Sequence, residues 1–509
     1  MVACPHAFAS ASGVKALREG GSAVDAALAA AASLAVLYPH MCSIGGDAFW
    51  LIYDAKAKKV FYLDGGGRAA ASATLERFAG QAEIPFRGLA PATLSTPGAV
   101  ASFCEAHARF GRLPFARCWE DAIRYAAEGF PVTERLSRWI EQTAPEMDAA
   151  TAAIFRPGAK VVKNPKLANT MRAIAEQGRA GFYEGEVARK LAKLGGFFTE
   201  RDLAAQGAYW GEPIYGTYRG VTIFETPAPT QGFTVLEMLN LIEPFELGPY
   251  LGPEHVHLLV QAKQIAYHDR DRSLADPRFA EVPLNKLVSK EYASERRSLM
   301  EPSKALPWDK VPSYGSLAGD TVYVAAVDAD GNAASLIFSL YGIFGACVTS
   351  AETGVTLQNR AAYFSLDPKH PNRLEPGKVP LHTLIVSLAF RDQKLWAVLG
   401  CMGADGQPQI HLQTYVAMID YGQDIQQALA APRWLSGRFG LGEARDTLHI
   451  EARFPPGTID ELERRGHPVD RWGDWNELAG HAHGITIDPR SGELAGGFDP
   501  RSDGAALGY

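Results

Sequence analysis

The sequence predicts a mixed α/β protein, and three observations support that class. Residues 1 to about 300 alternate Ala-rich helical stretches with short strand-like runs, which Gly- and Pro-rich joints separate. Strand-like runs then dominate from residue 321 to about 399. A helical stretch follows from Pro408 to Tyr421. With 509 residues, 47% of them hydrophobic and 21% charged, the chain has material for one large core or two packed subunits.

The first long apolar stretch runs from Ala26 to Leu37. It is rich in alanine, begins beside Asp25 and ends before Pro39. A membrane-spanning helix needs ~20 apolar residues, so this stretch is too short to span. We expect a buried core helix with Ser22 as its N-terminal cap.

Charge and composition exclude several partners. A net charge of −7 and a pI near 6.0 argue against nucleic acid or an anionic membrane. The first six residues contain neither the basic nor the apolar region of a secretory signal, which favours a cytoplasmic location. The six cysteines are scattered without a C-x-x-C spacing, which predicts a reduced compartment and no disulfide framework.

His481 and His483 have the spacing of a metal-binding pair, but no third ligand lies close to them in the sequence. Alternation along a strand explains the pair better. We therefore expect neither a metal nor a cofactor.

A segment from Pro302 to Gly319 is rich in Pro, Ser, Lys and Gly, and we expect an exposed loop there. Thr321 follows, at the start of the strand-like run Val322 to Val327. The turn signal at 328–332 then predicts a hairpin whose second strand reaches Leu340. A threonine that begins a strand is usually structural. If the bond before Thr321 were cut, however, its hydroxyl would be a nucleophile and its own α-amine the base.

Short motifs recur in one order along nearly the whole chain. They are Gly20–Ala27, Pro39-His40, Ile44–Phe49, Ser95–Val100, Thr226–Gly232, Ala266–Arg270, Ala275–Pro277, Val327–Asn332, Phe344-Gly345, Ala431–Arg433, Asp499–Asp503 and Gly508-Tyr509. In these motifs the sequence resembles the γ-glutamyltranspeptidase family, which are N-terminal-nucleophile hydrolases that are made as one precursor and cleave themselves before a threonine.

The resemblance implies a four-layer αββα sandwich, where local patterns alone predict only mixed α/β. It also implies cleavage between Asp320 and Thr321. The products would be a large subunit, 1–320, and a small subunit, 321–509, which share one core.

The resemblance also implies the catalytic residues. Thr321 would be nucleophile and base, and Ser339 would supply a hydroxyl that bonds the nucleophile. Asn332 would orient the new α-amine, and the backbone amides of Gly403 and Ala404 would form the oxyanion hole. Each has a structural alternative: a half-buried strand serine, a turn asparagine bonded locally, and a strand-to-helix turn. The glycine-rich loop is no phosphate loop, because no Lys-Ser/Thr ends it.

At the positions where the family binds the α-amine of a γ-glutamyl group, this sequence differs. Tyr363 replaces an acidic residue and Arg360 a neutral amide. A tyrosine does not neutralise an ammonium group and an arginine repels it. The pocket therefore suits an anionic substrate without an ammonium group.

The carboxylate-binding positions differ as well. His382 and Thr383 align with paired serines of the family, and the carboxylate-binding arginine is displaced by two positions, to Arg68. Tyr341 aligns with an asparagine of the family. Arginine, histidine and hydroxyl donors suit a small carboxylate. Taken singly, Arg360 also fits a surface ion pair and His382 a satisfied core histidine.

These residues favour an amidohydrolase that forms an acyl-enzyme on Thr321 and resolves it with water. Its small-molecule substrate would resemble those of the family's oxamate amidohydrolases or glutaryl-type acylases. Crowding from Tyr341, Tyr363 and His382 favours an oxamate-like one. γ-Glutamyl transfer or glutathione hydrolysis is an alternative, and an uncleaved binding protein is another. The expected partners are the self-derived subunits, which can pair as a dimer of heterodimers, and neither nucleic acid nor membrane.

Overall fold

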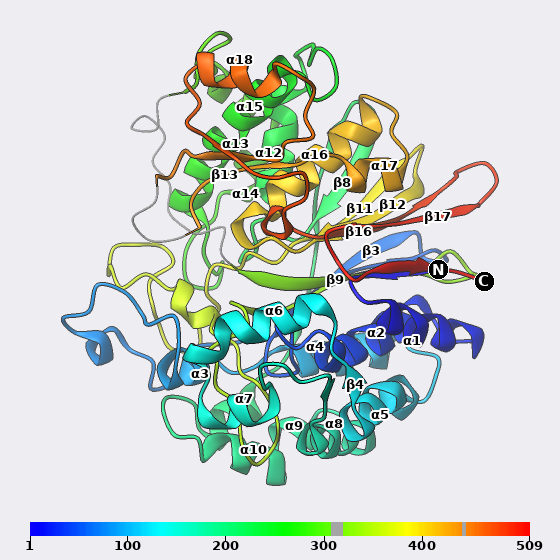
Figure 1. Ribbon diagram of the computed structural model, residues 1–509, viewed down its shortest axis with the longest axis vertical. Coiled ribbons are helices and arrows are strands. Elements are labelled where there is room, and N and C mark those ends of the chain that lie inside the picture. The colour runs from blue at the N-terminus through cyan, green and yellow to red at the C-terminus, as the bar shows by residue number, and fades with distance from the viewer. Residues whose placement is uncertain (307–318, 440–443) are drawn as a thin grey trace.

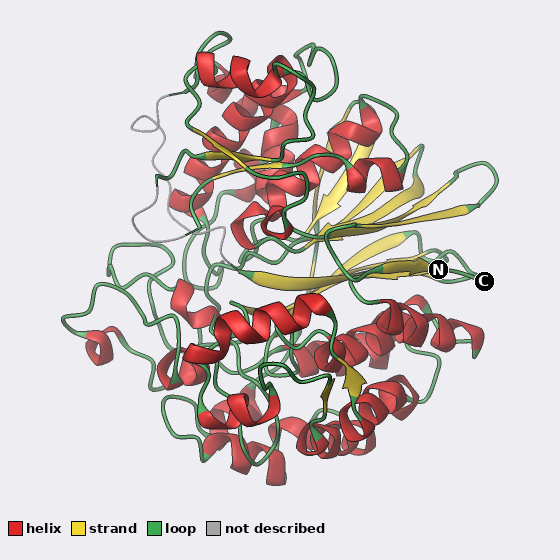
Figure 2. Ribbon diagram, viewed as in Figure 1, coloured by secondary structure: helices red, strands yellow, loops and turns green. Residues whose placement is uncertain are grey.

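Two β-sheets face each other in the middle of the molecule, and helices cover the outer side of each sheet (Figure 1, Figure 2). The computed structural model describes residues 1–306, 319–439 and 444–509, with the backbone alone at Asp320. The predicted mixed α/β class is confirmed. Most of the loop predicted at 302–319 lies outside the described residues.

The first sheet has the strand order β18-β1-β9-β10-β2-β3-β6, and the second β17-β16-β12-β11-β8-β7. Strands on both sides of the Asp320–Thr321 bond enter both sheets, so a cut at that bond would leave neither fragment with a complete sheet. The first sheet contains β1 (Val2–Cys4), β2 (Asp47–Asp54), β3 (Lys59–Gly65), β6 (Tyr209–Gly211), β9 (Asp320–Val327), β10 (Ala333–Tyr341) and β18 (Ala505–Leu507). The second contains β7 (Ile214–Tyr218), β8 (Val221–Glu225), β11 (Val386–Arg391), β12 (Lys394–Cys401), β16 (Ala482–Ile487) and β17 (Leu494–Phe498).

Short strands form two small sheets outside these layers. They are β13 (Trp434–Ser436), β14 (Leu448–Ile450) and β15 (Val469–Arg471) in one, and β4 (Phe130–Pro131) and β5 (Val161–Val162) in the other.

The helices divide between the two outer layers (Figure 1). The layer on the first sheet contains α1 (Ala7–Arg18), α2 (Ala23–Leu37), α3 (Leu89–Leu94), α4 (Ala99–Phe110), α5 (Glu120–Glu128), α6 (Glu134–Thr143), α7 (Ala149–Ile154), α8 (Pro165–Gln177), α9 (Ala180–Tyr183), α10 (Gly185–Ala192) and α11 (Glu200–Ala205). The layer on the second contains α12 (Phe233–Ile242), α13 (Pro253–Ser273), α14 (Leu284–Leu287), α15 (Lys290–Arg297), α16 (Gln407–Ile419), α17 (Ile425–Ala430) and α18 (Thr458–Arg464). None of the described helices is long and apolar enough for a transmembrane span.

The predicted core helix is α2, and every residue of it is buried. Ser22 Oγ accepts a hydrogen bond from the Asp25 amide, and the Asp25 carboxylate accepts one from the Ser22 amide. This capping box satisfies the first free N–H groups of the helix. Because the helix is apolar all round, it packs well only where neighbours surround it. The predicted hairpin is β9–β10, and the predicted helix from Pro408 is α16, which ends at Ile419.

Acid should destabilise this fold, because many buried histidines are neutral in it. Burial lowers the pKa values of His255 and His483 to about 4, and it lowers those of His40, His382 and His481 well below 6.5. In the unfolded chain these groups titrate near 6.5, so the unfolded state binds more protons below that pH. We expect the free energy of unfolding to fall from about pH 6.5 towards pH 4, by about 1.4 kcal/mol per histidine for each unit of pKa shift.

Denaturant unfolding at half-unit pH steps measures this dependence. Replacing His483 by Gln should reduce the slope of the unfolding free energy against pH by the contribution of about one proton. Constant stability between pH 6.5 and 4 would contradict the expectation.

Candidate active site

Thr321 lies at the start of β9, where the ladder with β10 is irregular. Val322 pairs with Phe338 and Asp320 with Tyr341, so Thr321 faces Ser339 and Leu340 at a β-bulge. Bulges re-aim side chains and are frequent beside active sites. On its other side β10 pairs with β2, and Ser339 is there the partner of Asp47. Thr321, Ser339 and Asp47 therefore lie side by side at one end of the first sheet.

All three side chains face the second sheet. In β9, Tyr323, Ala325 and Val327 pack in the core between the sheets, whereas Val322 and Val324 pack towards the helices. Side chains alternate along a strand, so Thr321 shares the inter-sheet face with Tyr323. The same alternation directs Ser339 and Asp47 there. The resulting site is enclosed: Thr321 is 1% exposed.

The second sheet contributes two loops to the same region. His382 and Thr383 lie just before β11, and the glycine-rich loop follows β12. Gly400 lies against the ring of Tyr323, and a Cβ on it would come within 2.3 Å of that ring. Gly319 lies against Ala404 and Tyr341. The chain that leads to Thr321 therefore crosses the loop predicted to form the oxyanion hole.

The backbone of this loop suits that role. Gly403 has φ 142° and Ala404 has φ 45°, both in the left-handed region. Glycine adopts such a conformation readily, and alanine does so with strain. Neither amide is a donor in the hydrogen bonds of the described residues. Two unengaged neighbouring N–H groups are what an oxyanion requires, although the role itself stays a prediction.

Arg360 is a buried cation beside Ser339 and Thr383. It begins the 3-10 turn η5 (Arg360–Tyr363) and is 1% exposed. Its Nη1 donates to Thr383 Oγ1 at 2.8 Å, its Nη2 donates to Ser339 Oγ at 3.4 Å, and its guanidinium stacks 4.4 Å from the Tyr341 ring centre. Among the ion pairs of the described residues, none includes Arg360. Burial lowers its pKa, and an anion bound there would relieve that unfavourable burial.

Asp47 forms a buried pair with His382, which residue patterns alone did not single out. His382 Nε2 lies 3.1 Å from Asp47 Oδ2, and His382 Nδ1 accepts from the Leu384 amide at 3.4 Å. The neutral imidazole therefore carries its proton on Nε2. Asp47 Oδ1 accepts three further bonds, from Gly67 N, Gly98 N and Gln358 Nε2. Burial raises the pKa of Asp47 to about 7, and Arg360 and these bonds oppose that rise. The one signal in the sequence is an acid at the head of an otherwise apolar strand.

Tyr363 is bound to a second acid, Asp405. The phenol donates to both carboxylate oxygens at 2.6 Å, and Arg270 forms an ion pair with Asp405 at 2.5 Å. Arg270 also donates to Gln231, whose amide nitrogen donates to the carbonyls of Thr383 and Ala404. These contacts connect the loop of Thr383 with the glycine-rich loop of Ala404 through Gln231, Arg270 and Asp405. Sequence reasoning missed the roles of all three residues. Each lies in or beside a motif, but only the fold shows their contacts.

The structure does not bring Arg68 to this group. Its guanidinium stacks on the ring of Tyr209 at 4.1 Å, and burial and the nearby Arg278 lower its pKa. The adjacent Gly67 amide donates to Asp47 and the Arg68 amide to Gln206, so the backbone there is fixed while the half-buried Arg68 side chain lies against Tyr209. Its predicted contact with the substrate carboxylate is not supported.

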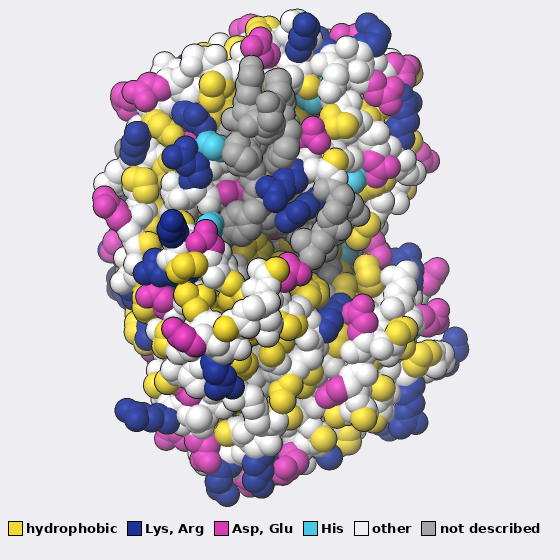
Figure 3. All heavy atoms as spheres, turned by 90° about the vertical axis from the view of Figure 1, so that its left-hand side faces the viewer, with side chains coloured by type: hydrophobic (Ala, Val, Ile, Leu, Met, Phe, Trp, Pro, Cys, Tyr) yellow, Lys and Arg dark blue, Asp and Glu magenta, His cyan; other side chains and the backbone are white. Residues whose placement is uncertain are grey.

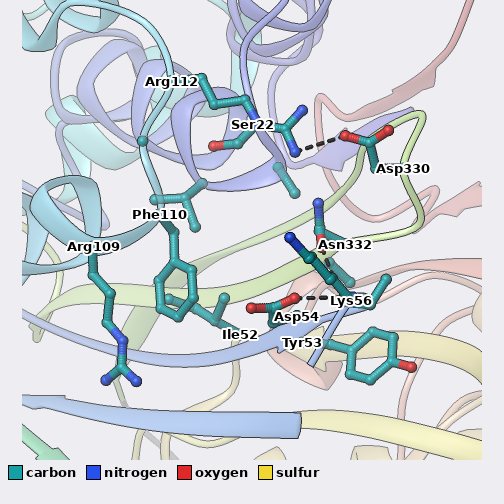
Figure 4. Close-up of a pocket in the computed structure, with 15 residues that line it drawn as sticks. Ser22, Ile52, Tyr53, Asp54, Lys56, Arg109, Phe110, Arg112, Asp330 and Asn332 are labelled. Carbon is teal, nitrogen blue, oxygen red and sulfur yellow. Dashed lines mark hydrogen bonds and ion pairs between the residues drawn. The ribbon is translucent and has the colours of Figure 1, made fainter. Parts of the chain in front are cut away.

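Asn332 is also far from Thr321, and its predicted role is wrong. Its side chain donates to Asp328 at 2.9 Å and accepts from the Ala55 amide at 2.9 Å. Thr321 lies at the opposite end of β9, about 20 Å away at ~3.3 Å per residue. Asn332 instead lines a surface pocket of about 630 Å³ beside Lys56, with the Arg112–Asp330 ion pair above it (Figure 4). A hairpin turn necessarily lies at the far end of the strand that it closes.

Known proteins match the chain along its whole length. A family model described as gamma-glutamyltranspeptidase matches residues 9–509. The glutathione hydrolase-like YwrD proenzyme of Bacillus subtilis is 40% identical over 524 residues, which cover 100% of this chain and 98% of that protein. The oxamate amidohydrolase proenzyme of Klebsiella pneumoniae is 38% identical over 528 residues, with the same coverage.

Solved structures agree with these matches. The crystal structure of a cephalosporin acylase from Bacillus halodurans superimposes with a TM-score of 0.91 and 35% identity, covering 100% of this chain and 96% of that one. A proenzyme is a precursor, and a threonine nucleophile is typical of this family. The chain is therefore an enzyme of the hydrolase and acyltransferase type and belongs to the gamma-glutamyltranspeptidase family.

Proposed function

We propose that this enzyme cleaves itself before Thr321 and then hydrolyses the amide of a small carboxylate that lacks an α-amine, such as oxamate. The observation that carries the proposal is the environment of Arg360. This buried guanidinium bonds only hydroxyl oxygens among the described residues, beside the strand that carries Thr321. A substrate carboxylate would supply the missing counter-charge and accept charge-assisted hydrogen bonds.

The amine side of the pocket supports the same substrate class. Where the family has an acid, this chain has Tyr363, whose O–H already donates to Asp405. Arg270 forms an ion pair with Asp405 and neutralises its charge. Among the described residues there, an ammonium group would find no acid without a partner, and it would lie near Arg360. The rings of Tyr341 and Tyr363, 5.5 Å apart between centres, narrow the space and favour a small acyl group.

The proposed reaction needs only groups of the chain and water. The α-amine that cleavage creates takes the proton of Thr321 Oγ as that oxygen attacks the amide carbon. The amides of Gly403 and Ala404 stabilise the oxyanion, at about 3 kcal/mol per donor. The α-amine then protonates the leaving amine, and water cleaves the acyl-enzyme by the same steps. Cleavage would leave subunits 1–320 and 321–509 joined through both sheets, in the αββα sandwich of N-terminal-nucleophile hydrolases.

The surface near the site is consistent with an anionic substrate. Several Lys and Arg side chains, dark blue in Figure 3, lie in the middle of the face that this view presents. Arg438 is one described cation of the region, and its charge acts on the phenol of Tyr341. Such a field raises the local concentration of anions.

The test is a comparison of kcat/KM for oxamate, a glutaryl amide and a γ-glutamyl amide with the cleaved enzyme. Oxamate should be the fastest and the γ-glutamyl amide the slowest, because only the latter carries an ammonium group. Faster turnover of the γ-glutamyl amide would refute the proposal.

One observation favours a second candidate, γ-glutamyl transfer or glutathione hydrolysis. The carboxylate of Asp405 lies beside Tyr363, close to where the family holds the α-amine. If a ligand ammonium displaced Arg270 from Asp405, that acid could bind it. Time-dependent inhibition by an α-amino-bearing glutamine analogue, but not by its des-amino form, would identify this activity.

A further inference from the structure

Asp47 connects the segments that build the Arg360 site. Its four hydrogen bonds come from the turn after β3, the start of α4, the segment before Arg360 and the segment before Thr383. It is 1% exposed, and on its strand it is the direct neighbour of Ser339. A change of charge or geometry at Asp47 therefore acts on both residues that bond Arg360.

In the part of the chain that the structure describes, the charged and titratable groups that act on Asp47 are His382, Arg360 and the phenol of Tyr183 from α9. Cleavage would add an α-amine on Thr321, on the other side of Ser339 from Asp47. Tyr183 keeps its proton, because its hydroxyl donates to the Pro97 carbonyl and burial raises its pKa. Among these groups Asp47 is the acid, and its charge acts on Arg360 without a direct ion pair.

A substrate carboxylate on Arg360 would bring a second negative charge into this enclosed space. Two carboxylates that share a buried site disfavour each other's ionisation. Uptake of a proton by the Asp47–His382 pair would reduce this repulsion. The two side chains lie 3.1 Å apart, and burial already raises the pKa of Asp47 to about 7. Protons on such a pair belong to both members.

We propose that the Asp47–His382 pair is the positioning element of the Arg360 site and takes up one proton when an anionic substrate binds. This inference rests on the proposed function. The proton comes from solvent and goes to Asp47 Oδ2, which still accepts the hydrogen bond from His382 Nε2–H with its other lone pair, and no bond between heavy atoms forms or breaks. Substrate affinity then weakens as the pH rises above about 7, because the free pair must first be protonated.

Calorimetric titration of the cleaved enzyme with oxalate tests this, because oxalate remains a dianion between pH 6 and 8 and is not hydrolysed. Two buffers of different ionisation enthalpy give the number of protons taken up. We expect a value near zero at pH 6 that rises towards one at pH 8. In Asp47→Asn the uptake should vanish, and oxalate should bind about tenfold more tightly than to the wild type at pH 8, since no proton is required.

The matched control is Glu225→Gln. Glu225 and His411 form another buried carboxylate–histidine pair, at 2.9 Å, in the second sheet. This variant should take up protons as the wild type does. Tighter binding in Asp47→Asn separates a change of charge from structural damage, which would only weaken binding.

Three results would overturn the inference: oxalate binding to the wild type without proton uptake at pH 8, unchanged uptake in Asp47→Asn, or weaker oxalate binding by that variant at pH 8. Unchanged uptake would assign the proton to the Thr321 α-amine. If Asp47→Asn does not fold, the wild type alone still tests the inference. A dissociation constant for oxalate that is the same at pH 6 and at pH 8 would then contradict the proposed proton uptake. A wild-type enzyme that neither binds oxalate nor hydrolyses oxamate would instead refute the proposed function.

Discussion

Thr321→Ala should remain one uncut chain and lose at least about 10⁴-fold in amidase activity, because the variant lacks both the nucleophile and the amine that cleavage creates. The intact mass of freshly purified protein measures the first effect. The wild type should give two species that divide between Asp320 and Thr321, which correspond to residues 1–320 and 321–509.

The matched control is Thr321→Ser, which keeps a hydroxyl at the bulge of β9 and should still cleave, although more slowly. Gly319, two residues before Thr321, lies against Ala404 in the loop that is proposed to stabilise the oxyanion. Two fragments from Thr321→Ala would place the nucleophile elsewhere. A single full-length chain in the wild type as well would favour a binding protein.

Arg360→Gln should lower kcat/KM for oxamate by about 10²- to 10³-fold, mainly through KM. The substitution removes the buried positive charge on which the proposed carboxylate rests. Removal of one partner from a buried charged pair costs about 2–5 kcal/mol, and each 1.4 kcal/mol is tenfold. Steady-state kinetics with oxamate measures the effect, and normal cleavage into two fragments confirms that the variant folds.

Arg68→Gln is the control for that experiment, since it makes the same chemical change on an arginine that stacks on Tyr209 away from the site. Its kcat/KM should stay within about threefold of the wild type, because the half-buried Arg68 side chain makes its ring contact with Tyr209 and none with Arg360, Ser339 or Thr383 among the described residues. The opposite ranking of the two variants would restore Arg68 as the carboxylate-binding residue. Equal losses would show that neither arginine alone defines the pocket.

Local patterns predicted the elements that depend on neighbouring residues. The capped, all-apolar α2 and the β9–β10 hairpin follow from capping chemistry, turn residues and periodicity, which act over a few positions. The position of Thr321 at a strand start follows from the same signals. The resemblance of ordered motifs predicted the family, which the match over residues 9–509 confirms.

The same patterns failed where the answer depends on contacts between distant segments. Asn332 has a suitable residue type, yet the hairpin places it about 20 Å from Thr321 at the rise of a strand. Arg68 follows the right motif, but its side chain stacks on Tyr209, which comes from a distant segment. The spacing of residues along the sequence does not show where either side chain lies in the fold.

The sequence by itself determined the residue types at the site: a threonine before a strand, an arginine where the family has an amide, and a tyrosine where it has an acid. Only the tertiary structure decided which of them meet. It brings β2, β9 and β10 together so that Asp47, Ser339 and Thr321 share one face, and it leaves Arg360 buried beside hydroxyls. The reason is that a charge is compensated by whatever packs against it, and those neighbours come from segments hundreds of residues apart, such as Asp47 and His382.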